Sequence, residues 1–578
     1  MYKKISLFIV SCLIVVGSAL YYRHQLQLEN RAYTALQSGY MNLKDGKKLQ
    51  AIGDFSFLAD YYSNKHNLTV KQIVAEALLK KADLLVELRD PDGAILSLEQ
   101  LSNLYLNSKD KKLQYDSAQA LFKEGSLLLQ QKQYEQAMII FSHLVSVFGQ
   151  DENLQIKRWV AQAMYAETEI LTHWGKADVA RNIHSSIIGQ FIKEKDHTIK
   201  LVVAKSIMQK TVDHLQNREW GKALYNSNTF IRLFDKDPSP DITDYLAHNL
   251  LYRAEILHRV TDIPDDEKEL FGNDPQSAAL TTYDELLAKI KDKENDEYPR
   301  YRATALLGKA QILQQHQNYE ESLKICNDII KQFDKNDYQK IVDVVAKTFL
   351  TKAQILANLK QDKQAITVYD SILKTYHYSE DHPTINTVLI SSYLEESQLL
   401  QKLNYKDEAL KLLTSAIDIF QGTKNERLFY QVSKAFLDLA ELQSDMKQYE
   451  QSVNTYTALI AAAHHKAYPL TRYNGALAIM KKAELLIKLK KGAAIGQTYD
   501  QLLTFYKNDQ DLKVRQVVAQ GMYDHAKGLF EHNRGYTAIG IINQIFKLFE
   551  KNKTDPTINQ ILQKTDALKK QLGSTIVW

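Results

Sequence analysis

The chain has 578 residues, and its 73 Lys+Arg against 69 Asp+Glu leave a formal net charge of +4 at pH 7. This near balance provides no basic surface for nucleic acid, so we expect no nucleic-acid partner. With only 9 Pro and 21 Gly the chain is not a linker-rich or all-β protein. Its length exceeds what one hydrophobic core supports, unless the protein is built of stacked repeats.

The N-terminus combines a short basic segment with an apolar run. Residues 1–4 contain two lysines, residues 5–22 carry no charge, and Arg23 follows. A bilayer crossing needs about 20 apolar residues, with about 17 as the lower limit. We therefore predict a cytoplasmic n-region over 1–4 and a transmembrane signal anchor over 5–22. The charge bias predicts a single-pass protein of a bacterial inner membrane, with the remaining chain facing the periplasm.

Two other interpretations of the same run stay open. Gly17-Ser18-Ala19 provides small residues for cleavage of a signal peptide. Ile9-Val10-Ser11-Cys12 resembles the acceptor sequence of a lipoprotein, but the apolar run continues past Cys12. That continuation favours the retained anchor.

Small residues recur along the rest of the chain at a fixed spacing. The steps are 43 residues, apart from one of 44 and one of 56. Self-similarity at such a period indicates a repeat architecture. The positions are Ala51, Ala94, Ala137, Ala180, Ala223, Ala279, Ser322, Ala365, Ala409, Ser452, Ile495 and Ala538.

Two further columns share this register. Small residues lie twelve positions upstream, at Gly39, Ala82, Gly125, Thr168, Thr211, Ala254, Ala310, Ala353, Ser397, Ala440, Ala483 and Ala526, where only the Ala254 repeat departs from the spacing. Mostly aromatic residues lie eleven positions downstream, at Tyr62, Tyr105, Phe148, Phe191, Phe234, Ile290, Phe333, Tyr376, Phe420, Ala463, Tyr506 and Phe549. Each repeat also shows two segments with the apolar period of a helix. The pattern predicts about twelve helix–turn–helix units in an all-α solenoid over residues 27–550. In each unit the facing small residues let two helices approach closely.

Two segments depart from the regular pattern. An acidic insert over residues 260–275, in the fifth repeat, contains Leu270-Phe271 as an apolar plug. A long loop in a strict array is often functional, but it is also a tolerated surface insertion because loop length costs little stability. Residues 556–572 predict a last helix with a polar face, which would cap the solenoid.

The three columns resemble the tetratricopeptide repeat (TPR) family, in which two small residues twelve apart are followed by an aromatic residue four positions later. That last position holds Phe55, Phe141, Tyr283, Tyr369, Tyr456 and Tyr499. The resemblance implies a right-handed superhelix that binds other proteins or peptides. The period of 43 departs from the family's usual 34. It is nearer to HEAT repeats, which lack this combination of residues.

In a TPR stack the first helix of each repeat lines the concave face. The positions just after the upstream small residues form an acidic and glutamine-rich stripe, interrupted by Ser126, Val212 and Lys527. Such a stripe suits an extended polypeptide, although it is equally a solvated helix surface. The candidate groove residues are Asp83, Glu169, Glu255, Gln311, Gln354, Gln398, Glu441 and Glu484.

These features predict a membrane-anchored interaction scaffold or assembly factor that is not an enzyme and needs no cofactor. Neither the two cysteines nor His464-His465 has the neighbours of a metal or redox site. The alternative is an accessory subunit of envelope polysaccharide or lipid assembly that binds glycan through Tyr40, Tyr165 and Tyr523. A peptide-sensing regulator is disfavoured because no DNA-binding segment precedes the repeats.

Overall fold

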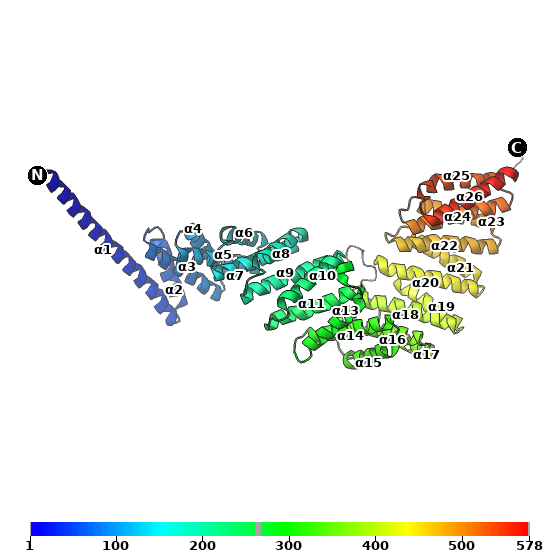
Figure 1. Cartoon of the computed structure of the whole chain (residues 1–578), viewed down its shortest axis with the longest axis horizontal. Coiled ribbons are helices and arrows are strands. Elements are labelled where there is room, and N and C mark those ends of the chain that lie inside the picture. The colour runs from blue at the N-terminus through cyan, green and yellow to red at the C-terminus, as the bar shows by residue number, and fades with distance from the viewer. Residues whose placement is uncertain (1, 260–267, 576–578) are drawn as a thin grey trace. The chain divides into compact units, whose positions relative to one another are not determined.

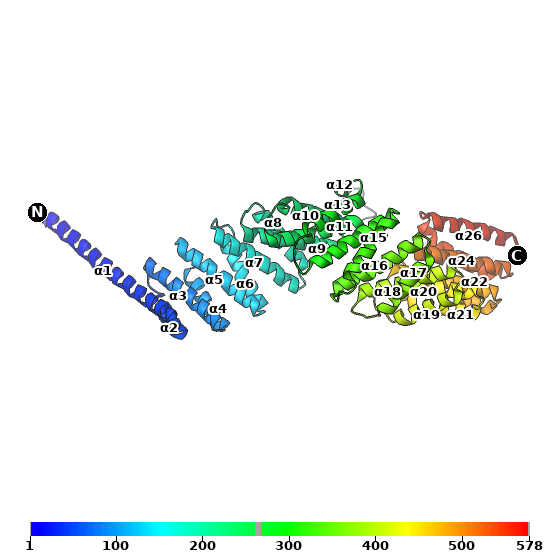
Figure 2. The ribbon, with the colours of Figure 1, turned by 90° about the horizontal axis from the view of Figure 1, so that it is seen from below.

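The computed structural model describes residues 2–259 and 268–575, and it describes side chains from Leu13 onward. In this part of the chain every regular element is a helix, so the all-α prediction is confirmed. The chain divides into two compact units, residues 1–289 and 290–578. Each unit contains consecutive antiparallel pairs, made of a first helix and a second helix (Figures 1 and 2).

The first helices of unit 1 are α1 (Tyr2–Lys44), α3 (Leu68–Glu87), α5 (Lys111–Gln130), α7 (Leu154–His173), α9 (His197–Gln216) and α11 (Pro240–Arg259). The second helices are α2 (Lys48–Tyr62), α4 (Pro91–Tyr105), α6 (Tyr134–Phe148), α8 (Ala177–Phe191), α10 (Trp220–Phe234) and α13 (Pro275–Lys289), with the short α12 (Lys268–Phe271) before α13.

The first helices of unit 2 are α14 (Tyr298–Gln315), α16 (Gln339–Asn358), α18 (Pro383–Lys402), α20 (Glu426–Asp445), α22 (Pro469–Lys488) and α24 (Leu512–Glu531). The second helices are α15 (Tyr319–Phe333), α17 (Asp362–Thr375), α19 (Lys406–Phe420), α21 (Tyr449–Ala463), α23 (Gly492–Tyr506) and α25 (Gly535–Phe549). The 3₁₀ turn η1 (Glu550–Asn552) and α26 (Pro556–Thr575) follow, with α26 against α24 and α25.

Local chemistry at the helix ends explains the regular length of the pairs. Asn67 and Asp110, at equivalent positions, accept hydrogen bonds from the Val70 and Leu113 amides and so cap their helices. Prolines begin helices and do not interrupt them, as at Pro91 and Pro469.

The turn between first and second helix has the same form in every pair except α11–α13, where the connection includes residues outside the described part of the chain. It contains one residue in the left-handed conformation, and the amide after it donates back across the helix end, as from Asp90 to the Leu85 carbonyl at 2.8 Å. This is a Schellman C-cap, which normally favours glycine. The left-handed residues are Gly46, Arg89, Lys132, Gly175, Arg218, Gln317, Lys360, Asn404, Lys447, Lys490 and Asn533.

The three columns of the sequence form the core. All twelve residues of the upstream small column are buried, as are the other two columns except for the half-buried Ile495 and Tyr376. The Ser322 hydroxyl donates to the Ala310 carbonyl at 2.6 Å, and the Ser452 hydroxyl donates to the Ala440 carbonyl at 2.7 Å. These contacts join the two small columns, so the predicted close approach of paired helices is confirmed.

The predicted membrane anchor over 5–22 is contradicted. No helix among the described residues is long and apolar enough to span a membrane. The same helix continues to Lys44, and its buried Ala32 and Leu36 belong to the core of the first repeat. The same finding contradicts the assignment to a single-pass protein of a bacterial inner membrane with periplasmic repeats.

The insert interrupts the pair α11–α13, which is the sixth pair counted from α1–α2 and not the fifth. Half of it, residues 260–267, lies outside the described part of the chain. Of the described remainder, α12 contacts α10, and Phe271 is 3% exposed. Half of the predicted apolar plug is therefore packed against unit 1, while the Leu270 side chain is among those not described.

Candidate binding face on the first helices

The eight candidate residues all lie on first helices, and none of them is buried. In unit 1 they lie on α3, α7 and α11, and in unit 2 they lie on the five consecutive first helices α14 to α22. Consecutive first helices in unit 2 contact one another directly. We call the surface that carries these positions the first-helix face.

Side chains of neighbouring repeats are linked across this face in unit 2. The Gln354 amide donates to Glu395 at 2.9 Å, which joins α16 to α18. Gln398 hydrogen-bonds to Asp438, joining α18 to α20. The Glu441 carboxylate lies 3.7 Å from the Lys481 ammonium, joining α20 to α22. Each link runs from a candidate residue to the position two residues before the small residue of the next repeat.

We call these three links between repeats the ladder. The linked side chains lie between neighbouring first helices, where they are partly shielded from water. Burial raises the pKa of the Glu395 carboxyl, against the opposing hydrogen bonds from Tyr369 and Gln354. The Tyr369 hydroxyl donates to the second Glu395 oxygen at 2.7 Å. Burial likewise raises the pKa of Asp438, and the hydrogen bond from Gln398 opposes it. Both carboxylates are thus held in place by amide donors.

The next link in the series differs, because both positions are acidic. Glu484 on α22 and Asp524 on α24 occupy the two equivalent places. Burial and then the proximity of Glu484 raise the pKa of Asp524, whereas the Gln520 hydrogen bond, Lys527 and Lys564 oppose the shift. The Gln520 amide donates to Asp524 at 2.8 Å from within α24. The face therefore becomes more acidic toward its C-terminal end.

Unit 1 carries a sparser version of the same ladder. Asp83 pairs with Lys123, 40 residues further along, which joins α3 to α5. Glu169 interacts electrostatically with Lys205 on α9, and burial raises the Glu169 pKa. Glu255 on α11 is half-buried and acts on the pKa of Tyr283. Lysines rather than amides thus partner Asp83 and Glu169 in unit 1.

Sequence reasoning missed the partner positions of the ladder, among them Lys123, Glu395, Asp438 and Lys481. They are polar side chains that recur about 40 residues after the candidate column, two residues before the next small position. That spacing was visible in the sequence, but it indicates a lateral contact only once the stacking of first helices is known.

The three tyrosines proposed for glycan binding are half-buried and engaged with protein. The Tyr40 hydroxyl donates to Glu76 at 2.6 Å. Lys205 lies over the Tyr165 ring, 5.5 Å from its centroid. Tyr523 packs against the core between α24 and its neighbours. These contacts lend the glycan hypothesis no support.

Among the described residues, no group of three or more His, Cys, Asp or Glu side chains is placed to hold a metal ion. His464 stacks on Phe505 at 4.3 Å between ring centroids, so it has a packing role. Cys326 is buried, and burial raises its thiol pKa to about 12, which makes it unreactive.

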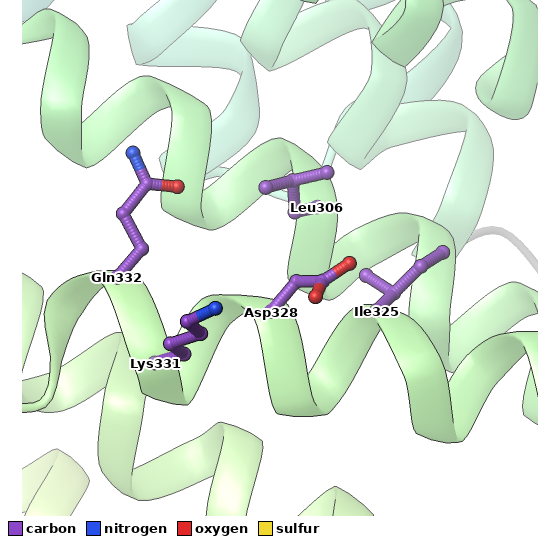
Figure 3. Close-up of a pocket in the computed structure, with 5 residues that line it drawn as sticks. All are labelled: Leu306, Ile325, Asp328, Lys331 and Gln332. Carbon is purple, nitrogen blue, oxygen red and sulfur yellow. The ribbon is translucent and has the colours of Figure 1, made fainter.

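Two open cavities lie in unit 2. One, of about 580 Å³, is lined by Leu306 of α14 and by Ile325, Asp328, Lys331 and Gln332 of α15 (Figure 3). The labelled side chains do not converge on a common point in this view. The other, of about 610 Å³, lies at the start of α14, where the Tyr338 hydroxyl donates to Glu297 at 2.9 Å.

Comparison with known proteins agrees with the repeat architecture. The tetratricopeptide repeat family matches residues 79–146, a stretch that spans most of α3 to α6. Among solved structures, the chain is similar to the apo form of RapI, with 11% identity, 80% of this chain and 99% of that chain covered, and a TM-score of 0.32. It is also similar to yeast Tom70, with 14% identity, 94% and 96% coverage, and a TM-score of 0.31. No curated protein matches.

TM-scores of 0.32 and 0.31 are too low for these structures to support a conclusion about the whole chain. The family match, the period and the buried small columns together make this a TPR-like helical-repeat protein.

Proposed function

We propose that this protein is a scaffold that binds other polypeptides along the first-helix face. The observation that carries the proposal is the ladder of unit 2. It places amide and carboxylate side chains of successive repeats on one face, half or fully exposed, and orients them by links between repeats. Side chains held in this way lose little further freedom on binding, which favours affinity.

The chemistry of the face indicates the kind of segment that it would take. Exposed amides such as Gln398 can donate to and accept from an extended backbone. The acidic end near Glu484 and Asp524 would favour Lys or Arg side chains. The face does not suit a C-terminal carboxylate, because that ligand needs a cluster of basic donors.

The experiment compares two double variants of the full chain as baits for proteins of the source cell. Glu441→Lys with Glu484→Lys reverses two charges on the first-helix face. Glu320→Lys with Glu408→Lys reverses two exposed charges on the second helices α15 and α19 and serves as the matched control.

Proteins that bind the face should be enriched by the wild type and by the control, and lost at least tenfold from the first variant. Circular dichroism of each bait verifies that it is folded. Equal enrichment by all three baits, or no enrichment by the wild type, would refute the proposed function.

A further inference from the structure

A second register of contacts joins first helices to the second helix of the preceding repeat at several junctions. The residue just before the small residue of a first helix faces the residue five positions after the small residue of that second helix. The Ser142 hydroxyl donates to Glu167 at 2.5 Å, Lys210 donates to Ser185 at 2.9 Å, and Arg253 donates to Asn228 at 2.9 Å. In all three pairs the residues lie 25 positions apart.

Two junctions place two acids at the positions of this register. Glu124 on α5 and Glu99 on α4 occupy them in unit 1, and Glu396 on α18 and Asp370 on α17 occupy them in unit 2; within each pair the two acids interact electrostatically. Glu124 is 4% exposed and Glu396 is 3% exposed. One carboxyl oxygen of each glutamate has no hydrogen-bond partner. At these places a buried acid thus meets a second acid, where the three junctions above have a hydroxyl or amide partner.

The surroundings of Glu396 do not compensate a negative charge. From α17, Asp370 raises its pKa and Lys374 opposes that effect. Lys374 lies 3.6 Å from Asp370 and is largely exposed, so its charge is shared and screened. Glu396 in turn acts on Tyr369 of α17 and Tyr393 of its own helix, both of which are neutral at ordinary pH. An ionised carboxylate left without a partner in such a place is costly.

We propose that the α17–α18 junction is a pH-sensitive weak point of unit 2, closed while Glu396 is protonated and loosened when Glu396 ionises opposite Asp370. The α4–α5 junction of unit 1 has the same construction through Glu124 and Glu99. Loosening one junction in a stack changes the relation of the first helices on its two sides, because each repeat contacts only its neighbours. In unit 2, the two repeats that meet at the α17–α18 junction are also joined by the hydrogen bond from Gln354 to Glu395.

The direction of the effect follows from proton linkage. Burial, and then Asp370, raise the pKa of Glu396 from its ordinary 4.5 to about 8. The closed junction therefore holds more protons than the open one between these values, and it opens more readily as the pH rises through that window. The opening equilibrium should increase roughly 50-fold between pH 6 and pH 8.

Hydrogen–deuterium exchange of the full chain at pH 6, 7 and 8 tests this, after correction for the intrinsic pH dependence of exchange. In the wild type, peptides covering α17 and α18 should lose protection by roughly 50-fold over this range. Glu396→Gln should abolish the loss, because an amide stays neutral. The exposed Glu408→Gln on α19 is the matched control and should behave as the wild type.

A second variant keeps the test decisive if Glu396→Gln fails to fold. Asp370→Asn removes the facing acid and leaves Lys374 beside Glu396, so the protection should fall less steeply. If α17 and α18 keep constant protection in the wild type, the proposal is wrong. It is equally wrong if the two variants lose protection as steeply as the wild type.

Discussion

The pairing of Gly125 with Phe141 provides a quantitative test of how the helices of a repeat approach each other. A Cβ atom added to Gly125 would lie 2.6 Å from Phe141 Cε1 and 2.8 Å from Cδ1, well inside van der Waals contact. Gly39 meets Phe55 in the same way. In the second repeat these two positions hold Ala82 and Leu98. In that repeat the alanine thus faces a smaller side chain than the ring of Phe141.

Gly125→Ala should therefore destabilise the α5–α6 pair. The alanine gains about 1 kcal/mol of helix propensity, but the displaced ring costs about 1–3 kcal/mol in a core already filled. The expected net loss is about 1 kcal/mol. Phe141→Leu alone should cost a similar amount through lost burial. The double variant should recover about 1–2 kcal/mol relative to the sum, because its alanine fills the space that the ring has left.

The assay is the local free energy of opening, from hydrogen exchange of peptides in α5 and α6. The control is Gly53→Ala on α2, where an added Cβ meets nothing within 4 Å. That change should stabilise α2 by about 0.5–1 kcal/mol. If Gly125→Ala stabilises its helix as much as Gly53→Ala, or if the double variant is additive, the packing argument is wrong.

Two further predictions concern the turn and the core. Lys447 lies at φ +64°, so Lys447→Gly should raise the free energy of unfolding by about 0.5–1 kcal/mol. The control Lys434→Gly, inside α20, should instead lower it by about 1 kcal/mol. Urea denaturation followed by circular dichroism distinguishes the two variants, and equal losses of stability would contradict the turn analysis. Burial, and to a smaller extent the nearby Lys210, lower the pKa of His184 from 6.5 to about 4. Unit 1 should therefore keep its full free energy of unfolding above pH 6.5 and lose about 3 kcal/mol of it as the pH falls toward 4. His184→Leu, which copies Leu98, should remove that acid sensitivity in denaturation series at pH 4 and 7, and an unchanged loss would show that His184 is not its source.

Much of this architecture was readable from the sequence because the forces that build it are local or act between neighbouring repeats. Ala310 and Ser322 lie twelve residues apart, and their contact requires only two helices and a turn. The turn itself could be placed between the columns, but its left-handed residue could not be identified. At Arg89, Lys360 and Lys447 a long side chain occupies a conformation that glycine normally favours.

The first-helix face could be predicted from the sequence only in part. The exposed positions on the first helices followed from the period alone. Their partners did not, because the rotation of one repeat against the next decides whether Gln354 meets Glu395 or solvent. The N-terminal run is a second departure, since its composition predicted a membrane span, whereas no helix among the described residues is long and apolar enough to cross a membrane.

By itself, the sequence determined that this protein is a stack of about twelve helix pairs with small residues between the paired helices, because that information repeats within each 43 residues. Only the tertiary structure decided which side chains meet between repeats. Those meetings include the ladder on the first-helix face and the opposed carboxyl groups of Glu396 and Asp370. The physical reason is that contacts between repeats depend on the stacking angle, which no single repeat encodes.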